Sequence, residues 1–98
     1  MLFMVIETFQ DNNMLPVYQR LQDKGRGLPD GLKYVDSWIE SNFSRCLQLM
    51  ECSDPALFQQ WVLHWQGTGA KFEFVPVVPS ARNRELLAPH LMAASAAR

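Results

Sequence analysis

The sequence predicts an α+β fold, a four-stranded antiparallel sheet with two helices on one face. Three observations lead to this prediction. Four β-favouring segments alternate with two helical patterns in the order βαββαβ, a short turn joins the two middle segments, and Asp54-Pro55 marks a helix start. Two β-α-β units with right-handed crossovers around a central hairpin form the ferredoxin-like plait. The 98 residues leave room for one domain of this kind and no second.

The expected elements occupy the first 79 residues. In chain order we expect a strand at Leu2–Phe9, a helix at Asn13–Asp23, strands at Leu32–Ser41 and Phe43–Cys52, a helix at Asp54–Gln66 and a strand at Lys71–Val78. Ser41-Asn42 is the expected tight turn between the middle strands, and the glycine-rich segment 24–31 is a loop. Residues 1–79 are thus the expected domain. Residues 80–98 form a C-terminal tail with room for a short helix interrupted at Pro89.

Composition and charge exclude several classes of function. Nine Lys and Arg against ten Asp and Glu give a net charge of −1, which offers no electrostatic footprint for nucleic acid or an anionic membrane. No apolar run reaches the length of a membrane span, and the N-terminus lacks the features of a signal peptide, so we expect a cytoplasmic protein. Cys46 and Cys52 lie too far apart along one strand for a disulfide, and no Cys or His spacing suits a metal. We expect free thiols and no cofactor.

One face of such a sheet is left uncovered by the helices, and its residues bear on assembly. We expect Leu2, Met4, Ile6, Leu47, Leu49, Phe72 and Phe74 to face the helices, and Phe3, Val5, Glu7, Phe9, Cys46, Gln48, Met50, Glu73, Val75 and Val77 to lie on the open face. A soluble monomer would then expose a large apolar patch, so two copies are expected to pair through their open faces as a homodimer. Val5→Asp is expected to disrupt that pairing. The alternative is a monomer whose tail folds back over its own sheet.

Several ordered blocks of the sequence resemble a known family. These blocks are K-G-R-G-L-P-D-G-L-K-Y-V-D-S-W (24–38), R-C-L-Q-L-M-E (45–51), the Asp-Pro helix start, Trp61 with Trp65, and F-E-F-V-P-V (72–77). Together they are similar to a family of small, mainly bacterial proteins defined only as a domain of unknown function. The resemblance spans about residues 1–78 and implies a dimeric α/β barrel, in which two ferredoxin-like plaits pair through their open sheet faces. It implies no reaction, since fold alone does not carry function.

A barrel of this kind would bring together the residues that we single out as candidates for a ligand cavity. These are Glu7, Tyr34, Asp36, Trp38, Cys46, Gln48 and Glu73. Carboxylates in an apolar enclosure have raised pKa values and can act as general acid or base, and Tyr34 with Trp38 could form an aromatic wall for a flat ligand. Arg26, in the glycine-rich loop, is the candidate contact for an anion. The competing interpretation is that the carboxylates are solvated or ion-paired and the aromatic residues pack in the interface.

No nucleophile with a neighbouring base is recognisable in the sequence. This favours ligand binding in a small-molecule cavity of the homodimer over catalysis. Two alternatives remain: a monooxygenase- or isomerase-like enzyme that needs no cofactor, and a dimerisation module whose centre is filled by its own side chains. An enclosed void with convergent polar groups would distinguish binding from the filled module.

Overall fold

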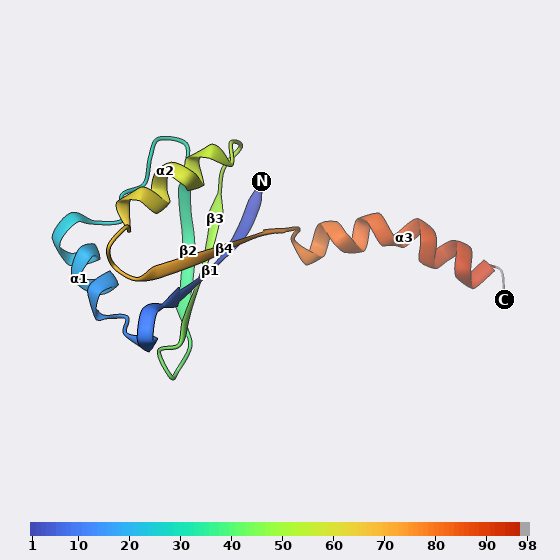
Figure 1. Ribbon diagram of the computed structural model, residues 1–98. Helices are drawn as coiled ribbons and strands as arrows, with labels where there is room; N and C mark the ends of the chain where they lie inside the picture. Colours follow the sequence, from blue (N-terminus) through green and yellow to red (C-terminus); the bar gives the residue numbers. More distant parts are fainter. Residues whose placement is uncertain (97–98) are drawn as a thin grey trace.

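A computed structural model of the chain describes residues 1–96, and it confirms the predicted α+β, ferredoxin-like arrangement (Figure 1). The elements in chain order are β1 (Leu2–Phe9), the short 3₁₀ helix η1 (Gln10–Asn12), α1 (Leu15–Lys24), β2 (Lys33–Ile39), β3 (Arg45–Glu51), α2 (Ala56–His64), β4 (Ala70–Val77) and α3 (Ser80–Ala96). The sheet has the order β2-β3-β1-β4, and all neighbouring strands are antiparallel. Both predicted helices are present, and each begins two residues later than expected.

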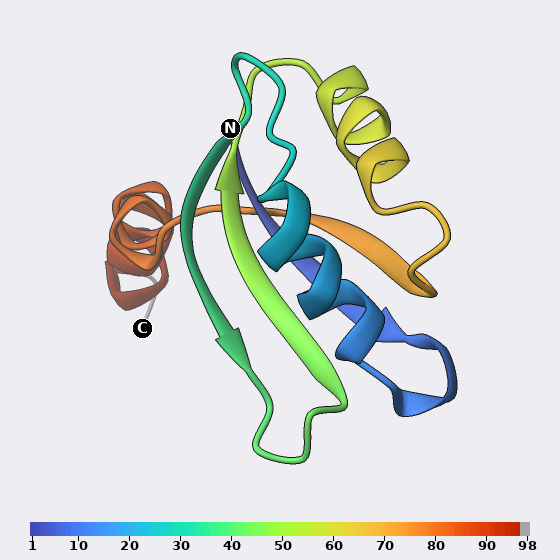
Figure 2. The ribbon, with the colours of Figure 1, turned by 90° about the vertical axis from the view of Figure 1, so that its left-hand side faces the viewer.

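Helices α1 and α2 lie side by side on one face of the sheet (Figure 2). Aromatic rings hold α2 against the sheet: Phe58 packs edge-on against Phe3 of β1 with 4.9 Å between ring centroids, and Trp61 lies 4.8 Å from Phe72 of β4. Val17 anchors α1 in the same core. Burying these large apolar side chains provides the main driving force for folding.

The structure reverses the predicted faces of β1 and β3. Phe3, Val5, Glu7 and Phe9 lie under the helices, and so do Cys46, Gln48 and Met50. The open face carries instead the half-buried Leu2, Met4, Ile6, Leu47 and Leu49. The prediction was wrong because β1 is apolar on both faces, so a period of two does not say which face meets the helices. The aromatic residues determine which face of β1 meets the helices, since Phe3 packs against Phe58 of α2 and Phe9 is buried in the same core. The faces predicted for β4 are correct. Because Val5 is fully buried in the core, Val5→Asp is a test of folding and not of pairing.

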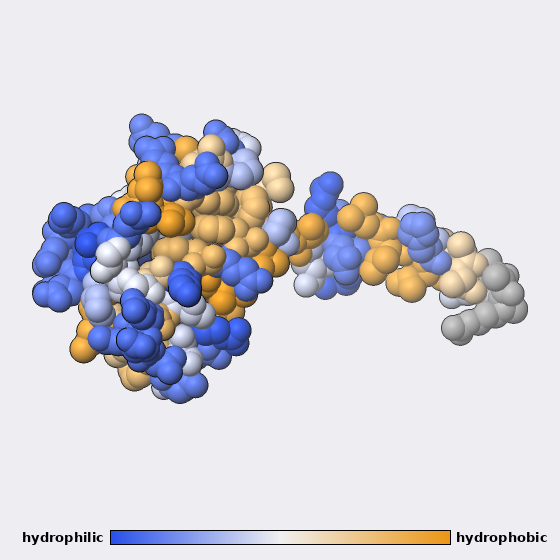
Figure 3. Space-filling model, viewed as in Figure 1, coloured by the Kyte–Doolittle hydropathy of each residue, from blue (hydrophilic) through white to orange (hydrophobic). Residues whose placement is uncertain are grey.

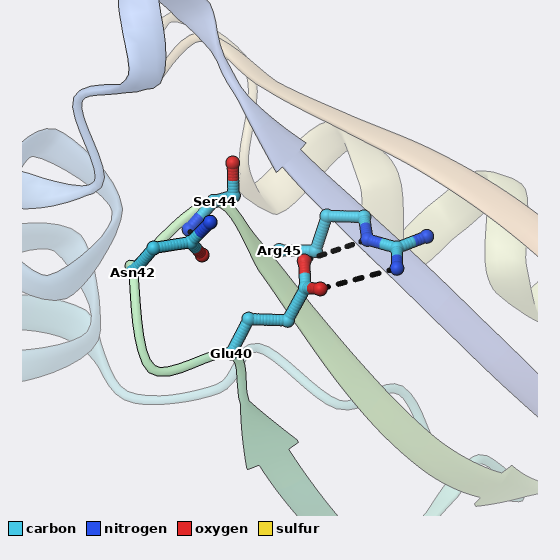
Figure 4. A network of polar contacts seen from close by, with 4 residues as sticks. All are labelled: Glu40, Asn42, Ser44 and Arg45. Carbon is cyan, nitrogen blue, oxygen red and sulfur yellow. Dashed lines mark hydrogen bonds and ion pairs between the residues drawn. The ribbon is translucent and has the colours of Figure 1, made fainter.

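The β2–β3 hairpin differs from the predicted tight turn at Ser41-Asn42. The backbone N–H of Glu40 donates to the carbonyl of Arg45, which leaves a four-residue turn at 41–44. Outside this turn the Arg45 guanidinium donates two hydrogen bonds to the Glu40 carboxylate, at 2.7 and 3.2 Å (Figure 4). The bonds from Arg45 hold the pKa of Glu40 below its usual value. A bulge between Tyr34 and Asp36 shifts the register of β2 and changes which side chains share a face.

The C-terminal helix α3 stands apart from the rest of the fold. It is a single helix that continues through Pro89, longer than the interrupted short helix expected from the sequence. It projects from the open-face side of the sheet, away from α1 and α2 (Figure 1), and gives the molecule a long dimension of 59 Å. The tail therefore does not fold back over its own sheet. The last two residues of the 80–98 tail lie outside the described part of the chain.

Candidate functional site

A small cavity of about 90 Å³ lies between α1 and the helix-covered face of the sheet. It is lined by Glu7, Val17, Tyr18, Leu21, Arg26, Ser37, Cys46, Gln48 and Trp65. Its floor is built from side chains that are all more than nine-tenths buried, including Glu7, Cys46, Gln48 and Trp65. The space is several times what one ordered water requires. The cavity thus combines a partly enclosed volume with polar side chains that line it.

Glu7 on β1 is the charged group on this floor. Its exposed fraction is 4%, and no hydrogen bond joins its carboxyl to another group within residues 1–96. Burial disfavours the charged form and raises the pKa of Glu7 from 4.5 to about 7. Near neutral pH the carboxyl is therefore close to half-protonated, able to donate a proton or to accept one.

Two further polar groups face the cavity beside Glu7. Cys46 is the register partner of Glu7 on β3, and Gln48 lies two residues further along that strand. Burial, and to a smaller extent the Glu7 charge, raise the pKa of the Cys46 thiol to about 11, so it stays protonated. Trp65, at the end of α2, contributes a buried indole Nε1–H that has no hydrogen-bond acceptor within residues 1–96. A buried donor without a partner is costly, and a ligand or ordered water that accepts its hydrogen bond would remove that cost.

The rim of the cavity is more exposed and is fixed by the glycine-rich loop. The Arg26 guanidinium stacks 3.7 Å above the centre of the Tyr34 ring, and the Tyr34 hydroxyl is hydrogen-bonded to Ser37. Two bonds hold the loop to α2: Trp61 Nε1 donates to the carbonyl of Arg26, and His64 Nε2 donates to the carbonyl of Gly25, each at 2.9 Å. Arg26 is thereby positioned at the rim, where a cation can meet an anionic part of a ligand.

The seven residues predicted from the sequence divide between the two faces of the sheet. Glu7, Cys46 and Gln48 line the cavity, and Tyr34 adjoins it through Ser37 and Arg26. Asp36, Trp38 and Glu73 lie on the open face, where Trp38 pairs with Leu47 and is 52% exposed. Sequence reasoning missed Tyr18 and Trp65. The available signal for Tyr18 is its helical spacing from Met14 and Leu21, and for Trp65 its helical spacing from Trp61, but such patterns indicate packing in the core as readily as a site.

Trp65 also forms the wall between this cavity and a broader surface groove. The groove has a volume of about 780 Å³ and runs along the ends of β1 and α2 past Thr8, Gln10, Val62 and Lys71. Most of its lining side chains are exposed. The smaller cavity is instead lined by the buried polar side chains of Glu7 and Gln48, which makes it the stronger candidate site.

Fold and site together define a class: a ferredoxin-like α+β domain with a small acidic-floored cavity between its first helix and its sheet. Within this class the chain belongs to the family described as domain of unknown function DUF3303, which matches residues 1–91 and so includes most of α3. No curated protein and no solved structure shows significant similarity to the chain.

Two searches of the described residues bear on other kinds of site. Within residues 1–96, no group of three or more His, Cys, Asp and Glu side chains is placed to hold a metal ion. Among the helices that the structure describes, none has the length and apolar character needed to cross a membrane.

Proposed function

We propose that the protein binds a small organic molecule in the cavity under α1. The observation that carries this proposal is that the buried Glu7 carboxyl, for which residues 1–96 supply no hydrogen-bond partner, lines one partly enclosed space together with Gln48, Cys46 and the Trp65 side chain. A filled dimerisation module would have closed this space with apolar side chains, since protein interiors are close-packed. A buried carboxyl that has no partner within residues 1–96 and borders open space supports instead a site that a ligand completes.

The lining groups indicate the chemistry of the ligand. Gln48 both donates and accepts, and Glu7 does either according to its protonation state. Val17, Leu21 and Cys46 contribute apolar contact, and Arg26 adds a positive charge at the rim alone. These features suit a compact molecule that has one apolar side, carries hydrogen-bonding oxygens or nitrogens, and is neutral where it meets the floor.

Proton transfer is the second candidate function. A general acid or base works best when its pKa lies near the working pH, and burial brings the pKa of Glu7 to about 7. In this alternative Glu7 takes a proton from one atom of the bound molecule and returns it to another, as in an isomerase that needs no cofactor. Cys46 takes no part as a nucleophile, because burial raises the pKa of its thiol to about 11.

Homodimerisation through the open sheet face completes the proposal. That face carries a continuous set of half-buried apolar side chains, with Trp38 exposed beside them: Leu2, Met4, Ile6, Leu47, Leu49, Val75 and Val77. Removing them from water would be favourable by about 25 cal/mol for each Å² of apolar area buried. The two cavities of such a dimer lie on the outer sides of the paired sheets, so each subunit holds a complete site.

Native mass spectrometry of the protein, followed by NMR with a set of small neutral and mono-anionic organic compounds, tests ligand binding. We expect a co-purified molecule, or compounds that shift the amide resonances of Glu7, Cys46 and Gln48. Glu7→Gln, which keeps the shape of the side chain but removes its proton equilibrium, should weaken the binding of a compound so identified about tenfold. A protein that arrives empty, and in which no compound moves these resonances, would contradict the proposal.

The matched control for Glu7→Gln is Glu73→Gln. Glu73 is an exposed carboxylate of the neighbouring strand β4, on the other face of the sheet. This substitution makes the same chemical change outside the cavity, so we expect it to leave the affinity unchanged. Equal effects of the two substitutions would indicate a general effect of charge and not a contact in the cavity.

A further inference from the structure

Helix α3 is a long element that its own domain does not support, and it carries several exposed apolar side chains. Among its exposed side chains are Leu86, Leu87, Leu91 and Met92, whose exposed fractions run from 44% to 73%. The side chains described along α3 are exposed throughout, so its own domain buries none of them. Space-filling views show apolar residues on the body where α3 leaves it and again along the helix (Figure 3). Exposed apolar surface of this extent indicates an interaction site.

Local propensity does not explain a stable helix here. Isolated helices of about 15 residues are marginal in water, and a proline in a helix interior costs about 3 kcal/mol because it removes a backbone hydrogen bond and clashes with the preceding turn. Pro89 lies in the middle of α3. Most helical stability in proteins comes from packing against another surface. The body of the same chain does not supply that surface, so a separate one is required.

The direction and length of α3 point to the second copy of the chain. The helix leaves β4 on the open-face side, the side on which the proposed partner packs (Figure 1). Stacked sheets lie about 10 Å apart, and a helix layer adds about 10 Å more. Seventeen residues of helix extend about 25 Å at 1.5 Å per residue. Starting from its own sheet, α3 is therefore long enough to pass along the whole thickness of a partner subunit.

Charge and area favour the same occupant. Residues 1–79 contain six Lys and Arg against nine Asp and Glu, a formal charge of −3, whereas α3 (Ser80–Ala96) contains two Arg against one Glu, a charge of +1. A basic helix is thus complementary to an acidic body. Four strands about 4.8 Å apart and about 25 Å long give a sheet face of about 500 Å² in outline, small beside the roughly 800 Å² per partner of a stable interface. Two exchanged helices would enlarge the buried area substantially.

We propose that α3 is an exchanged arm: in the homodimer, the α3 of each subunit packs with Leu87 and Leu91 against the body of the other subunit. This inference rests on the proposed dimer and extends it. Leu87 and Leu91 are four residues apart and so lie on the same side of the helix, one turn apart. Exchange between two identical chains is reciprocal and closes on itself, which prevents open-ended polymerisation.

Sedimentation equilibrium of the full chain tests the arm. We expect the wild-type protein to be dimeric at micromolar concentration and Leu91→Asp to raise its dissociation constant at least tenfold. Ala93→Asp is the matched control, because two residues further along a helix the same charge lies on nearly the opposite side. We expect it to change the constant less than threefold. A wild-type dimer that Leu91→Asp does not weaken overturns the exchanged arm but leaves the open-face dimer standing, whereas a wild-type monomer overturns both.

Crosslinking identifies what the arm contacts. A benzophenone attached to Leu91→Cys should crosslink, in dimers mixed from ¹⁴N- and ¹⁵N-labelled chains, to residues 1–79 of the differently labelled chain. Cys46 and Cys52 are buried and leave the introduced thiol as the accessible one. Crosslinks confined to one chain, or to the α3 of the partner, would overturn the proposal. An unchanged amide spectrum of residues 1–79 in each variant shows that the body is folded.

Discussion

Burial raises the pKa of Glu7 from 4.5 to about 7, and this shift makes stability depend on pH. Between these two values the folded protein holds more protons than the unfolded chain, so the free energy of unfolding falls as pH rises through that window. At about 1.4 kcal/mol per pKa unit the loss reaches at most about 3 kcal/mol by pH 8. Glu7→Gln removes this dependence, and we expect the variant to be more stable than the wild type above pH 7. Urea unfolding between pH 4.5 and 8.5 measures both profiles.

The comparison with Glu73→Gln makes the Glu7 prediction specific. Glu73 lies on the other face of the sheet, away from the cavity, so Glu73→Gln should leave the loss of stability that Glu7 causes between pH 4.5 and 7 in place. If Glu7→Gln kept the wild-type slope of stability against pH, the titration would belong to another group. The proposed role of Glu7 in proton transfer would then be contradicted.

The two cysteines are expected to react slowly in the folded protein. Cys46 is buried beside Glu7 with a pKa of about 11, and Cys52 is buried in the core. At pH 8 about one Cys46 thiol in a thousand is ionised, and the thiolate is the reactive form. Labelling with a chromogenic disulfide reagent should therefore be slow in buffer and rapid in denaturant. Rapid modification of Cys46 in the native protein would restore it as a candidate nucleophile.

Individual site residues were predictable by type but not by position. Glu7, Cys46 and Gln48 were predicted as site residues because polar side chains within apolar strands are unusual, and the structure brings these three together. Their face was predicted wrongly, because a strand with apolar residues on both sides carries no local record of where the helices lie. Ser37 and Tyr34 share the rim only because a bulge intervenes between Tyr34 and Asp36, and nothing in the residue types announces that bulge.

Among the elements, the loop between α1 and β2 offers a matched pair of substitutions. Gly25 and Gly27 both have left-handed backbone angles, with φ of +70° and +68°. A Cβ on Gly27 would meet the His64 ring at 2.2 Å, whereas one on Gly25 would meet nothing within 4 Å. We expect Gly25→Ala to cost about 1 kcal/mol for backbone strain and Gly27→Ala about 2 kcal/mol more, because the loop must leave α2.

Chemical denaturation measures the two alanine variants against the wild type. The displaced loop should also loosen Arg26, so Gly27→Ala alone is expected to broaden the amide resonances of Tyr34 and Ser37 at the cavity rim. Equal stabilities of the two variants would show that contact with His64 does not hold the loop in place.

Element boundaries were predicted best where the sequence has strong conformational signals. The start of α2 follows from Asp54-Pro55: the Asp54 carboxylate accepts a hydrogen bond from the N–H of Ala56 at 3.0 Å, as expected of a residue before a helix. β1 was predicted residue for residue, because helix-start signals follow it directly. The hairpin turn was predicted two residues too short, since Ser41-Asn42 satisfies the composition of a tight turn as well as that of a longer one. Pro89 suggested an interruption that α3 does not have.

At the scale of the whole molecule, the order of the elements determines the fold almost completely. Right-handed crossovers and a central hairpin leave few sheet orders for βαββαβ, and the structure has the expected order β2-β3-β1-β4. The direction of α3 was not predictable, because the side chains described along it are exposed and no burial pattern in the sequence fixes its position. Helix α3 and the apolar open face lie on the same side of the sheet, so one partner surface could cover both.

Pairing of the open faces is tested at their centre. Leu49 lies in the middle of the sheet, between Met4 on β1 and Asp36 on β2, with its side chain on the open face. Leu49→Asp leaves the core under the helices intact but would place a second carboxylate beside Asp36, between two largely apolar sheets. We expect light scattering at micromolar concentration to give twice the chain mass of 11.3 kDa for the wild type and 11.3 kDa for the variant. The matched control Gln59→Asp, on the exposed side of α2, should remain dimeric. A wild-type mass of 11.3 kDa would show that the open face does not pair two copies of this chain.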